Sequence, residues 1–219
     1  MSKTKTSNRI KSIDGMFNFF NDDIKSLYEA IETVNYINCV LLLKKGVNPN
    51  SEYKDFPLLY WIFVFMQKAD SEKTKDKYID IYNLFLSFNA NINQLIYYTY
   101  DDVINKKRVS NHIPLISIFS IINLSDFVKL LLENRELNIN FIDISGNTPL
   151  IYAASNGYNT IVKMLAKDKR INLLLQNNDY TASDYARFNK HNDIHTYLFK
   201  LMITEINSIL SKVDGLGRK

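Results

Sequence analysis

The pattern of apolar and polar positions divides most of the chain into short helical segments. Within a segment the apolar residues recur at spacings of three and four, as Ile161, Met164 and Leu165 do. This spacing places them on one face of a helix. The segments come in pairs, and a short extended stretch and a polar turn follow each pair. The second helix of each pair is expected over residues 37–46, 78–88, 126–135, 160–169 and 193–202.

The first helix of each pair begins at a helix-start signal. Pro57 and Pro114 open two of the apolar runs, Thr148–Pro149 and Thr181 open two others, and Ser26 opens the earliest. Threonine and serine cap a helix through the side-chain oxygen, and proline fits the first turn because that turn needs no N–H donor. The extended stretches after the second helices are residues 47–50, 90–93, 137–140 and 171–174.

Together the segments form a repeating unit of turn, helix, loop, helix and extended return. Thr148 and Thr181 lie at matching places in two units and are 33 residues apart, and five units fit between residues 24 and 201. A unit of this size cannot bury its own apolar face, so it must stack on its neighbours. The sequence therefore predicts an all-α fold, an α-solenoid of stacked helix-loop-helix repeats.

One unit resembles the ankyrin repeat. The stretch GNTPLIYAASNGYNTIVKMLAKD (146–168) is similar to the family pattern that contains T-P-L-H-x-A. Residues 41–50 and 130–140 resemble helix ends and returns of the same family. The resemblance implies about five divergent repeats over residues 24–201, with short β-hairpin fingers and a role in protein binding. The matching residues are Thr148, Pro149, Leu150, Ala153, Ala154, Gly157, Ile161, Val162 and Leu165.

Several positions depart from the family pattern. Ile151 stands where the signature has histidine, and Ile113 stands where the third unit should have threonine. Phe119 replaces a small alanine, and the second unit has Trp61 and Ile62 where small residues would let helices approach closely. These bulky residues predict a wider spacing between repeats and a stability that varies along the stack.

Two insertions interrupt the period. Pro57 and Pro114 are 57 residues apart, which is longer than one repeat. The first insertion, residues 67–77, is charged and nearly neutral overall, and it is read as a solvated loop or an extension of a helix. The second, residues 94–112, falls where ankyrin-like proteins place their β-hairpin fingers, so the resemblance implies a long finger there.

The second insertion is rich in tyrosine. Tyrosine gives a large, fairly rigid contact area with a polar tip and is enriched at protein interfaces. The tyrosines are therefore candidates for a recognition element. The alternative is that they fold back and cover core exposed by the irregular spacing. They are Tyr97, Tyr98 and Tyr100, followed by Asp101, Asp102, Lys106, Lys107 and Arg108.

The resemblance also implies contact positions outside the long finger. In ankyrin-like proteins these are the finger tips and the exposed side of the first helices. The predicted partner-binding residues are therefore Tyr53, Lys54, Asp55, Tyr97, Tyr98, Tyr100, Ile144, Ser145, Asn147, Tyr152, Ser155, Asn156, Asn177, Asn178 and Tyr180.

The net charge of +4 does not point to a nucleic-acid partner. The basic residues gather in the two tails, residues 1–13 and 212–219, and leave the repeat region slightly acidic. A folded nucleic-acid binder carries its charge as a patch on the ordered surface. The tails are read as solvated ends, with a basic arm as the alternative.

The chain has no feature of a secreted or membrane protein. Its N-terminus lacks an apolar signal segment, and the apolar runs at 56–66 and 113–122 are too short to span a bilayer. Cys39 is the one cysteine, so no internal disulfide can form, and its apolar surroundings indicate a buried side chain rather than a reactive thiol. We expect a soluble, cytoplasmic protein, and delivery to a host cell stays open.

Nothing in the sequence indicates catalysis. No nucleophile, phosphate-binding or zinc-protease motif occurs among its 219 residues. His191 and His195 are four residues apart and share a helix face, but two ligands do not make a metal site. The sequence predicts no catalytic residue, no cofactor and no metal.

The two ends of the repeat region are expected to need capping. Residues 1–23 form a tail and an apolar segment, with Met16, Phe17, Phe19 and Phe20 covering the first repeat. Residues 202–219 form the end of the last helix and a tail. That helix has an apolar side made of Met202, Ile206, Ile209 and Leu210, which caps the stack or docks on another chain.

We therefore predict a monomeric, non-enzymatic module that binds a protein partner through its concave face and fingers. A structural scaffold that pairs two copies through its C-terminal helix or its Phe-rich N-terminal segment is the alternative, and an unrecognised enzyme is a third. The Lys, Asn, Ile and Tyr content suggests an AT-rich genome, and family analogy adds a host protein as a possible partner.

Overall fold

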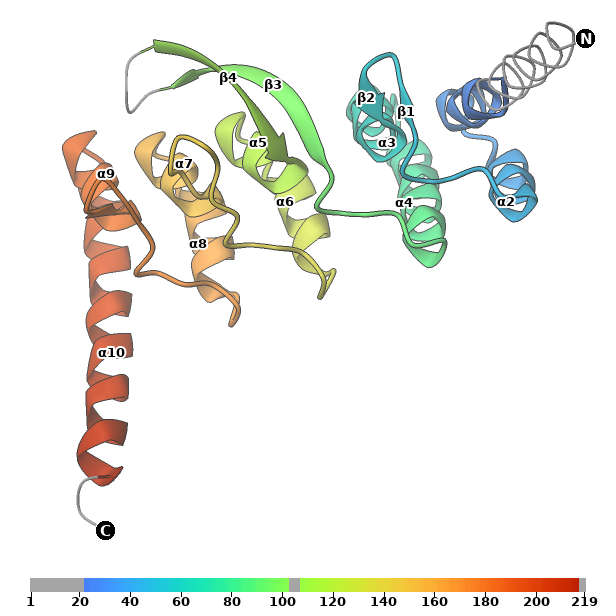
Figure 1. Cartoon of the computed structure of the whole chain (residues 1–219). Coiled ribbons are helices and arrows are strands. Elements are labelled where there is room, and N and C mark those ends of the chain that lie inside the picture. Colours follow the sequence, from blue (N-terminus) through green and yellow to red (C-terminus); the bar gives the residue numbers. More distant parts are fainter. Residues whose placement is uncertain (1–21, 103–106, 217–219) are drawn as a thin grey trace, which may run out of the picture. The chain divides into compact units, whose positions relative to one another are not determined.

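The computed structural model describes residues 22–102 and 107–216 (Figure 1). The chain divides into two compact units, residues 1–94 and 95–219. Met16, Phe17, Phe19 and Phe20, for which we predicted a capping role, lie outside the described residues. None of the helices in the described ranges is long and apolar enough to cross a membrane.

The first unit contains two helix pairs and one short hairpin. A helix over residues 22–32 precedes α2, and a hairpin of two-residue strands leads into α3 and α4. Helix α4 packs on both α3 and α2. The elements are α2 (Tyr36–Lys45), β1 (Glu52–Tyr53), β2 (Phe56–Pro57), α3 (Leu58–Gln67) and α4 (Glu72–Ser87).

The second unit begins with a long hairpin and continues with three helix pairs. Helices α5, α7 and α9 lie side by side in one layer, and α6, α8 and α10 form a second layer (Figure 1). The elements are β3 (Leu95–Asp102), β4 (Lys107–Pro114), α5 (Leu115–Ile121), α6 (Ser125–Leu132), α7 (Pro149–Ser155), α8 (Asn159–Lys167), β5 (Gln176–Asn177), β6 (Tyr180–Thr181), α9 (Ala182–Phe188) and α10 (Asn192–Leu216).

The two helix layers differ in burial. Every residue of α7 is buried, because α5, α8 and α9 all pack against it. Helix α8 is amphipathic: Ile161 and Leu165 are buried, whereas Lys163 and Lys167 are exposed. Apolar residues at helical spacing therefore form the core of this unit, as the sequence pattern predicts.

The predicted start signals act as helix caps. The Thr148 hydroxyl accepts a hydrogen bond from the backbone N–H of Ile151 at 3.1 Å, and Pro149 occupies the first turn. Thr181 and Asp184 form a reciprocal capping box at the start of α9. These contacts satisfy backbone donors that have no partner within the helix. Pro57 and Pro114 begin α3 and α5 without a side-chain cap.

The turn inside a helix pair uses a residue with positive φ. In the second unit these residues are Asn123, Gly157 and Lys190, with φ of 62°, 78° and 66°. The left-handed conformation reverses the chain between the two helices, and glycine adopts it at least cost. Gly157 therefore supplies the left-handed turn between α7 and α8.

Asparagines connect neighbouring extended returns within each of the two units. Within the second unit, the Asn140 side chain donates to the carbonyl of Arg170 at 2.7 Å and accepts from the N–H of Asn172 at 2.9 Å. In the first unit, Asn50 makes the equivalent bonds to Asn89 and Asn91. The same arrangement in both units shows that they share one repeat plan, and it gives the abundant asparagines a structural role.

The structure shows what the described residues of the two insertions form. Residues 72–77 extend α4 by more than a turn, so residues 67–77 form a short loop and a helix extension. Residues 95–102 and 107–114 pair as the two strands of the expected hairpin finger. The last predicted helix is also observed, as α10.

Gly157→Ala should destabilise the second unit. Its positive φ alone costs a side chain about 1–2 kcal/mol, and a Cβ there would lie 2.5 Å from the His191 ring. We expect a lower melting temperature in thermal unfolding. The control is the same change in a His191→Ala background, where the loss should be smaller. Equal losses in the two backgrounds would show that the ring contact is not a constraint.

Candidate protein-binding surface

The long hairpin has one buried face and one exposed face. Side chains alternate along a strand, so every second residue points the same way. Ile96, Tyr100 and Ile113 are buried against α5 and α7. Tyr97 is 58% exposed and Leu95 is 41% exposed. The insertion therefore contributes both to the core and to the surface.

A buried carboxylate fixes the hairpin to the body of the second unit. The Tyr152 hydroxyl donates a hydrogen bond to Asp143 Oδ2 and also contacts the Tyr100 hydroxyl. The Tyr100 hydroxyl lies 3.5 Å from the same carboxylate oxygen. Burial, followed by the bonds to Asp143 and Tyr100, raises the pKa of Tyr152 far above its ordinary value. The Tyr152 hydroxyl is thus held as a neutral donor in the interior.

The same carboxylate shapes the turn before α7. Asp143 Oδ1 accepts from the backbone N–H groups of Ser145 and Asn147 at 2.8 and 2.9 Å. The Asn147 side chain accepts from the Asn177 amide at 2.7 Å, which joins this turn to the β5–β6 hairpin. The hairpin, the turn and the next hairpin are therefore held by one continuous polar network.

The exposed face of the long hairpin combines aromatic, hydroxyl and imidazole groups. The rings of Tyr97 and His112, which pair across the strands, have centroids 5.2 Å apart. Thr99 and Ser110 share a hydrogen bond of 2.8 Å. Arg108 is exposed at the outer end. This face offers large contact area with both donors and acceptors, a combination common at protein interfaces.

The turn tips of the following repeats add apolar groups. Ile144 is 86% exposed and Ile142 is 50% exposed, in the turn that Asp143 organises. At the β5–β6 hairpin, Tyr180 is 45% exposed and packs edge-on against Phe188 at 4.9 Å. Ile142 and Ile144 therefore place exposed apolar area together at this turn.

The first unit has its own aromatic surface on β1, β2 and α3. Phe56 and Tyr60 stack at 4.6 Å, and the Trp61 indole donates to the carbonyl of Tyr53 at 2.8 Å. The rings of Tyr53, Phe56, Tyr60 and Trp61 are all partly exposed. Lys54 Nζ lies 4.5 Å from the centre of the Tyr28 ring. The bulky residues that depart from the family pattern here build one connected cluster.

The structure divides the predicted contact residues into two groups. Five have buried side chains, which the polar network or the packing of α7 uses: Tyr100, Asn147, Tyr152, Ser155 and Asn177. The other ten are at least partly exposed: Tyr53, Lys54, Asp55, Tyr97, Tyr98, Ile144, Ser145, Asn156, Asn178 and Tyr180.

Sequence reasoning missed several residues of the exposed hairpin face. His112 lies opposite Tyr97 across the two strands. Thr99 and Ser110 form the next pair on the same face. Strict alternation along both strands would have identified them once the strand pairing was known. That pairing was the missing information. Ile142, which is 50% exposed in the same turn as Ile144, was also missed.

The described residues offer little for catalysis or metal binding. In this part of the chain no three His, Cys, Asp or Glu side chains are placed to hold a metal ion. His195 bonds to Ser183 at 2.9 Å, and the ring of His191 packs at Gly157. Cys39 is fully buried, and burial raises the pKa of its thiol to about 12.

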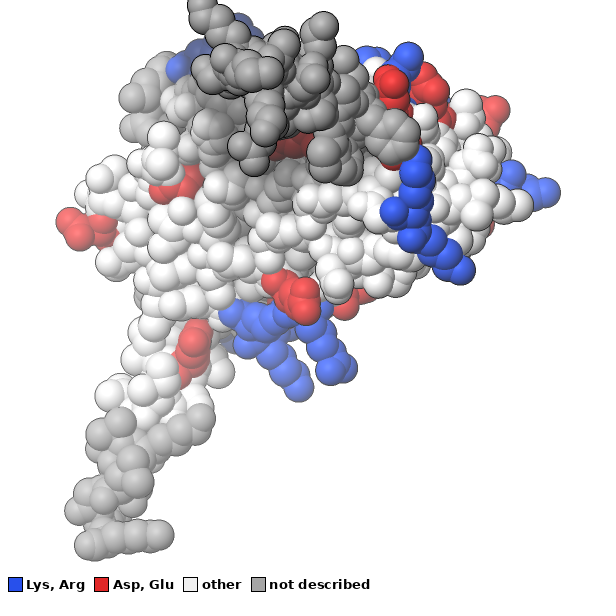
Figure 2. Space-filling model, turned by 45° about the vertical axis from the view of Figure 1, so that its right-hand side comes forward, with Lys and Arg blue, Asp and Glu red and all other residues white. Residues whose placement is uncertain are grey.

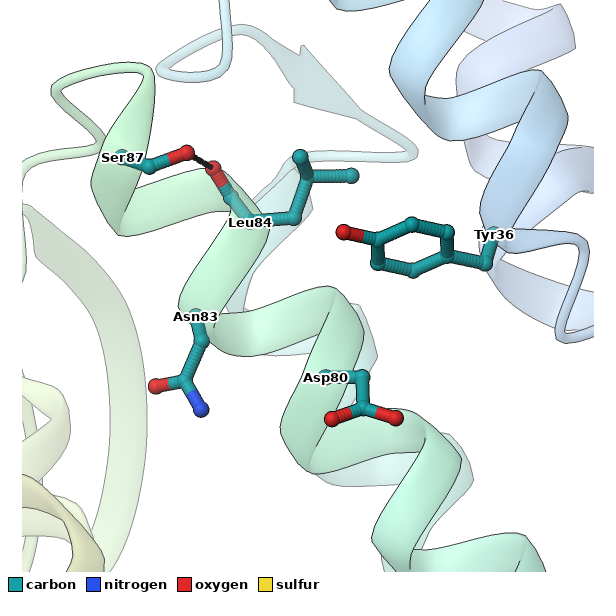
Figure 3. Close-up of a pocket in the computed structure, with 5 residues that line it drawn as sticks. All are labelled: Tyr36, Asp80, Asn83, Leu84 and Ser87. Carbon is teal, nitrogen blue, oxygen red and sulfur yellow. Dashed lines mark hydrogen bonds between the residues drawn. The ribbon is translucent and has the colours of Figure 1, made fainter.

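A recess between α2 and α4 is shallow and open (Figure 3). One carboxylate, Asp80, faces it from α4 together with Asn83, and Tyr36 faces it from α2. The Ser87 hydroxyl donates to the carbonyl of Leu84 at 2.6 Å. No base lies beside this hydroxyl among the lining residues, so the recess lacks the pairing that an activated nucleophile needs.

Charges on the face drawn in Figure 2 are scattered. Where described atoms are visible, most of that surface is neutral, and the basic side chains form small separate groups with acidic ones nearby. A nucleic-acid footprint is a continuous basic stripe or patch. The visible part of this face does not have that form.

These features define a helix-loop-helix repeat protein. Its helices come in pairs with a left-handed turn between them, asparagines link its extended returns, and hairpins lie at the repeat boundaries. A family model of ankyrin repeats, with three copies, matches residues 81–177 and 120–209. Together these matches span residues 81–209, more than half of the 219 residues. The chain belongs to the ankyrin repeat family. A search of curated proteins gave no match.

Tyr152→Phe should destabilise the second unit and change its response to alkaline pH. Loss of a buried hydrogen bond to a carboxylate costs about 1.5–3 kcal/mol, measurable by urea unfolding. The pKa of Tyr152 is higher in the folded chain than in the unfolded chain, where it is about 10. The neutral hydroxyl therefore stabilises the fold in full at pH values below about 10. This contribution is lost as pH rises further, since the unfolded tyrosine then ionises first.

The wild type should therefore lose stability above about pH 10 more steeply than the Phe variant. The free energy of unfolding at several pH values up to 11.5 checks this. Tyr97→Phe is the matched control, because that ring is exposed. Parallel pH profiles for wild type and Tyr152→Phe would contradict the assignment.

Proposed function

We propose that this chain is a non-enzymatic binding module that recognises a protein partner through its hairpin fingers and the adjoining concave side of an α-solenoid. The observation that carries the proposal is the exposed face of the β3–β4 hairpin. The strands of this hairpin have eight residues each, whereas those of the β1–β2 and β5–β6 hairpins have two. Its inner face is anchored by Tyr100, which leaves Tyr97 and His112 on the outer face.

Membership of the ankyrin repeat family supports this class of function, because ankyrin repeats are in general protein-interaction modules. The partner would contact rigid groups: the hairpin is fixed by the Asp143 network, so little conformational entropy is lost on binding. Tyr97, Leu95 and Ile144 supply apolar area, and Thr99, Ser110 and His112 supply hydrogen bonds.

The aromatic surface of the first unit is proposed as a separate contact region. Lys54 and Asp55 form the tip of the β1–β2 turn, with φ of 52° and 66°. Partly exposed aromatic rings lie directly behind this tip. Tip charges would set orientation, and the rings would supply contact area.

The test is affinity capture from lysates with wild type and two pairs of substitutions. Tyr97→Ser with His112→Ser changes the hairpin face, and Ile142→Ser with Ile144→Ser changes the turn tip. Because these side chains are exposed, melting temperatures should stay within a few degrees of wild type. Lys163→Gln with Lys167→Gln, exposed on α8, is the control pair.

We expect a protein recovered by wild type and the α8 control to be lost, or weakened at least tenfold, with the hairpin variant. Hydrogen exchange on the recovered complex should show protection at residues 95–99 and 108–112. A partner that binds the hairpin variant as tightly as wild type, with no protection there, would exclude this face.

A further inference from the structure

The last helix is much longer than the other second helices and uses only part of its length to pack on the body of its unit. Ile194 and Leu198 are 1% exposed, because α9 and α8 cover them. Beyond them α10 continues to Leu216 and projects past the end of α8 (Figure 1). The described part of this projection is mostly neutral on the face drawn in Figure 2.

The projecting part of α10 carries a second apolar face. Phe199 is 52% exposed, Ile203 42%, Ile209 48% and Leu210 55%. Met202 and Ile206, which lie between them on the helix, are partly exposed. A cap needs only the face that covers the preceding repeat. Among the described residues of the second unit, Phe199, Ile203, Ile209 and Leu210 of this face stay exposed.

The apolar residues of this face follow a heptad spacing. Phe199 and Ile206 are seven apart, as are Met202 and Ile209, and the sequence continues the series with Val213 and Leu216. Apolar residues at alternating spacings of three and four form the seam of a coiled coil, in which a second helix fills the holes of the first. The series spans about 25 Å of helix at 1.5 Å per residue.

We propose that this seam is a self-association site, at which α10 pairs antiparallel with α10 of a second copy of the chain. If position 206 lies opposite position 209 of the second copy, then 202 lies opposite 213 and 199 opposite 216. Every seam position then meets an apolar residue. The arrangement is twofold symmetric, as an isologous dimer requires.

Charge complementarity selects this orientation. The positions beside the seam on one flank are 205 and 212, occupied by Glu and Lys. In the antiparallel register position 205 of one helix lies beside position 212 of the other, and symmetry repeats the pair. On the opposite flank, position 203 of one helix, an isoleucine, lies beside position 210 of the other, a leucine. A parallel pair would instead place Glu205 beside Leu210.

The first experiment measures mass against concentration for the full chain by sedimentation equilibrium. Wild type should approach the mass of two chains as concentration rises. Ile209→Lys, in the seam, should raise the dimer dissociation constant at least about tenfold, because it places a charge in the seam. Thr204→Lys adds the same charge on the exposed side of α10 that faces away from the seam and should leave the constant unchanged.

The second experiment tests the orientation. Glu205→Lys and Lys212→Glu should each weaken the dimer, because like charges then meet twice, and the double change should restore it. A chain that stays monomeric at every concentration, or a dimer indifferent to Ile209→Lys, would overturn the proposal. So would single charge reversals that the double change does not rescue. Partner capture through the hairpin is measured separately with the Tyr97 and His112 variants, so either proposal can fail alone.

Discussion

The arrangement of the second unit depends on one buried carboxylate. Asp143 lies in the turn before α7, where two backbone N–H groups and the Tyr152 hydroxyl donate to it. A carboxylate in the interior is costly unless donors surround it. Those donors come from the turn itself and from α7, and Tyr100 of the long hairpin lies at its edge. Satisfying one charge therefore positions three segments that are distant in sequence.

The surface follows from this anchor. Side chains alternate along a strand, so burying Tyr100 and Ile96 forces Tyr97 and Thr99 to the opposite face. A shift of one residue would bury Tyr97 and expose Tyr100. The polar network disfavours that shift, since the Tyr100 hydroxyl would lose its buried partners. Alternate residues of the tyrosine-rich insertion are thus assigned to the core and to the surface.

The helix pairs and their caps could be predicted because they depend on local chemistry. Thr148 and Gly157 act within their own turn, so the sequence around them is sufficient. The burial of Tyr152 and Ser155 could not be predicted from the repeat pattern, because it depends on neighbours: α5 and α9 close over both sides of α7. The choice between Tyr97 and Tyr100 likewise depends on a residue more than forty positions later, Asp143.

In a repeat protein each repeat is stabilised mainly by the neighbouring repeats. Inside the second unit this is visible in single residues: the Arg170 guanidinium donates to the carbonyls of Leu132 and Asn134 at the end of the preceding α6. Asn140 makes the complementary bonds in the other direction along the chain. Helices α9 and α10 form the last pair that the structure describes. An end that only needed protection would present a polar outer face, whereas α10 continues outward with Phe199 and Ile209 exposed. Its length and apolar spacing suit a partner helix better than they suit solvent.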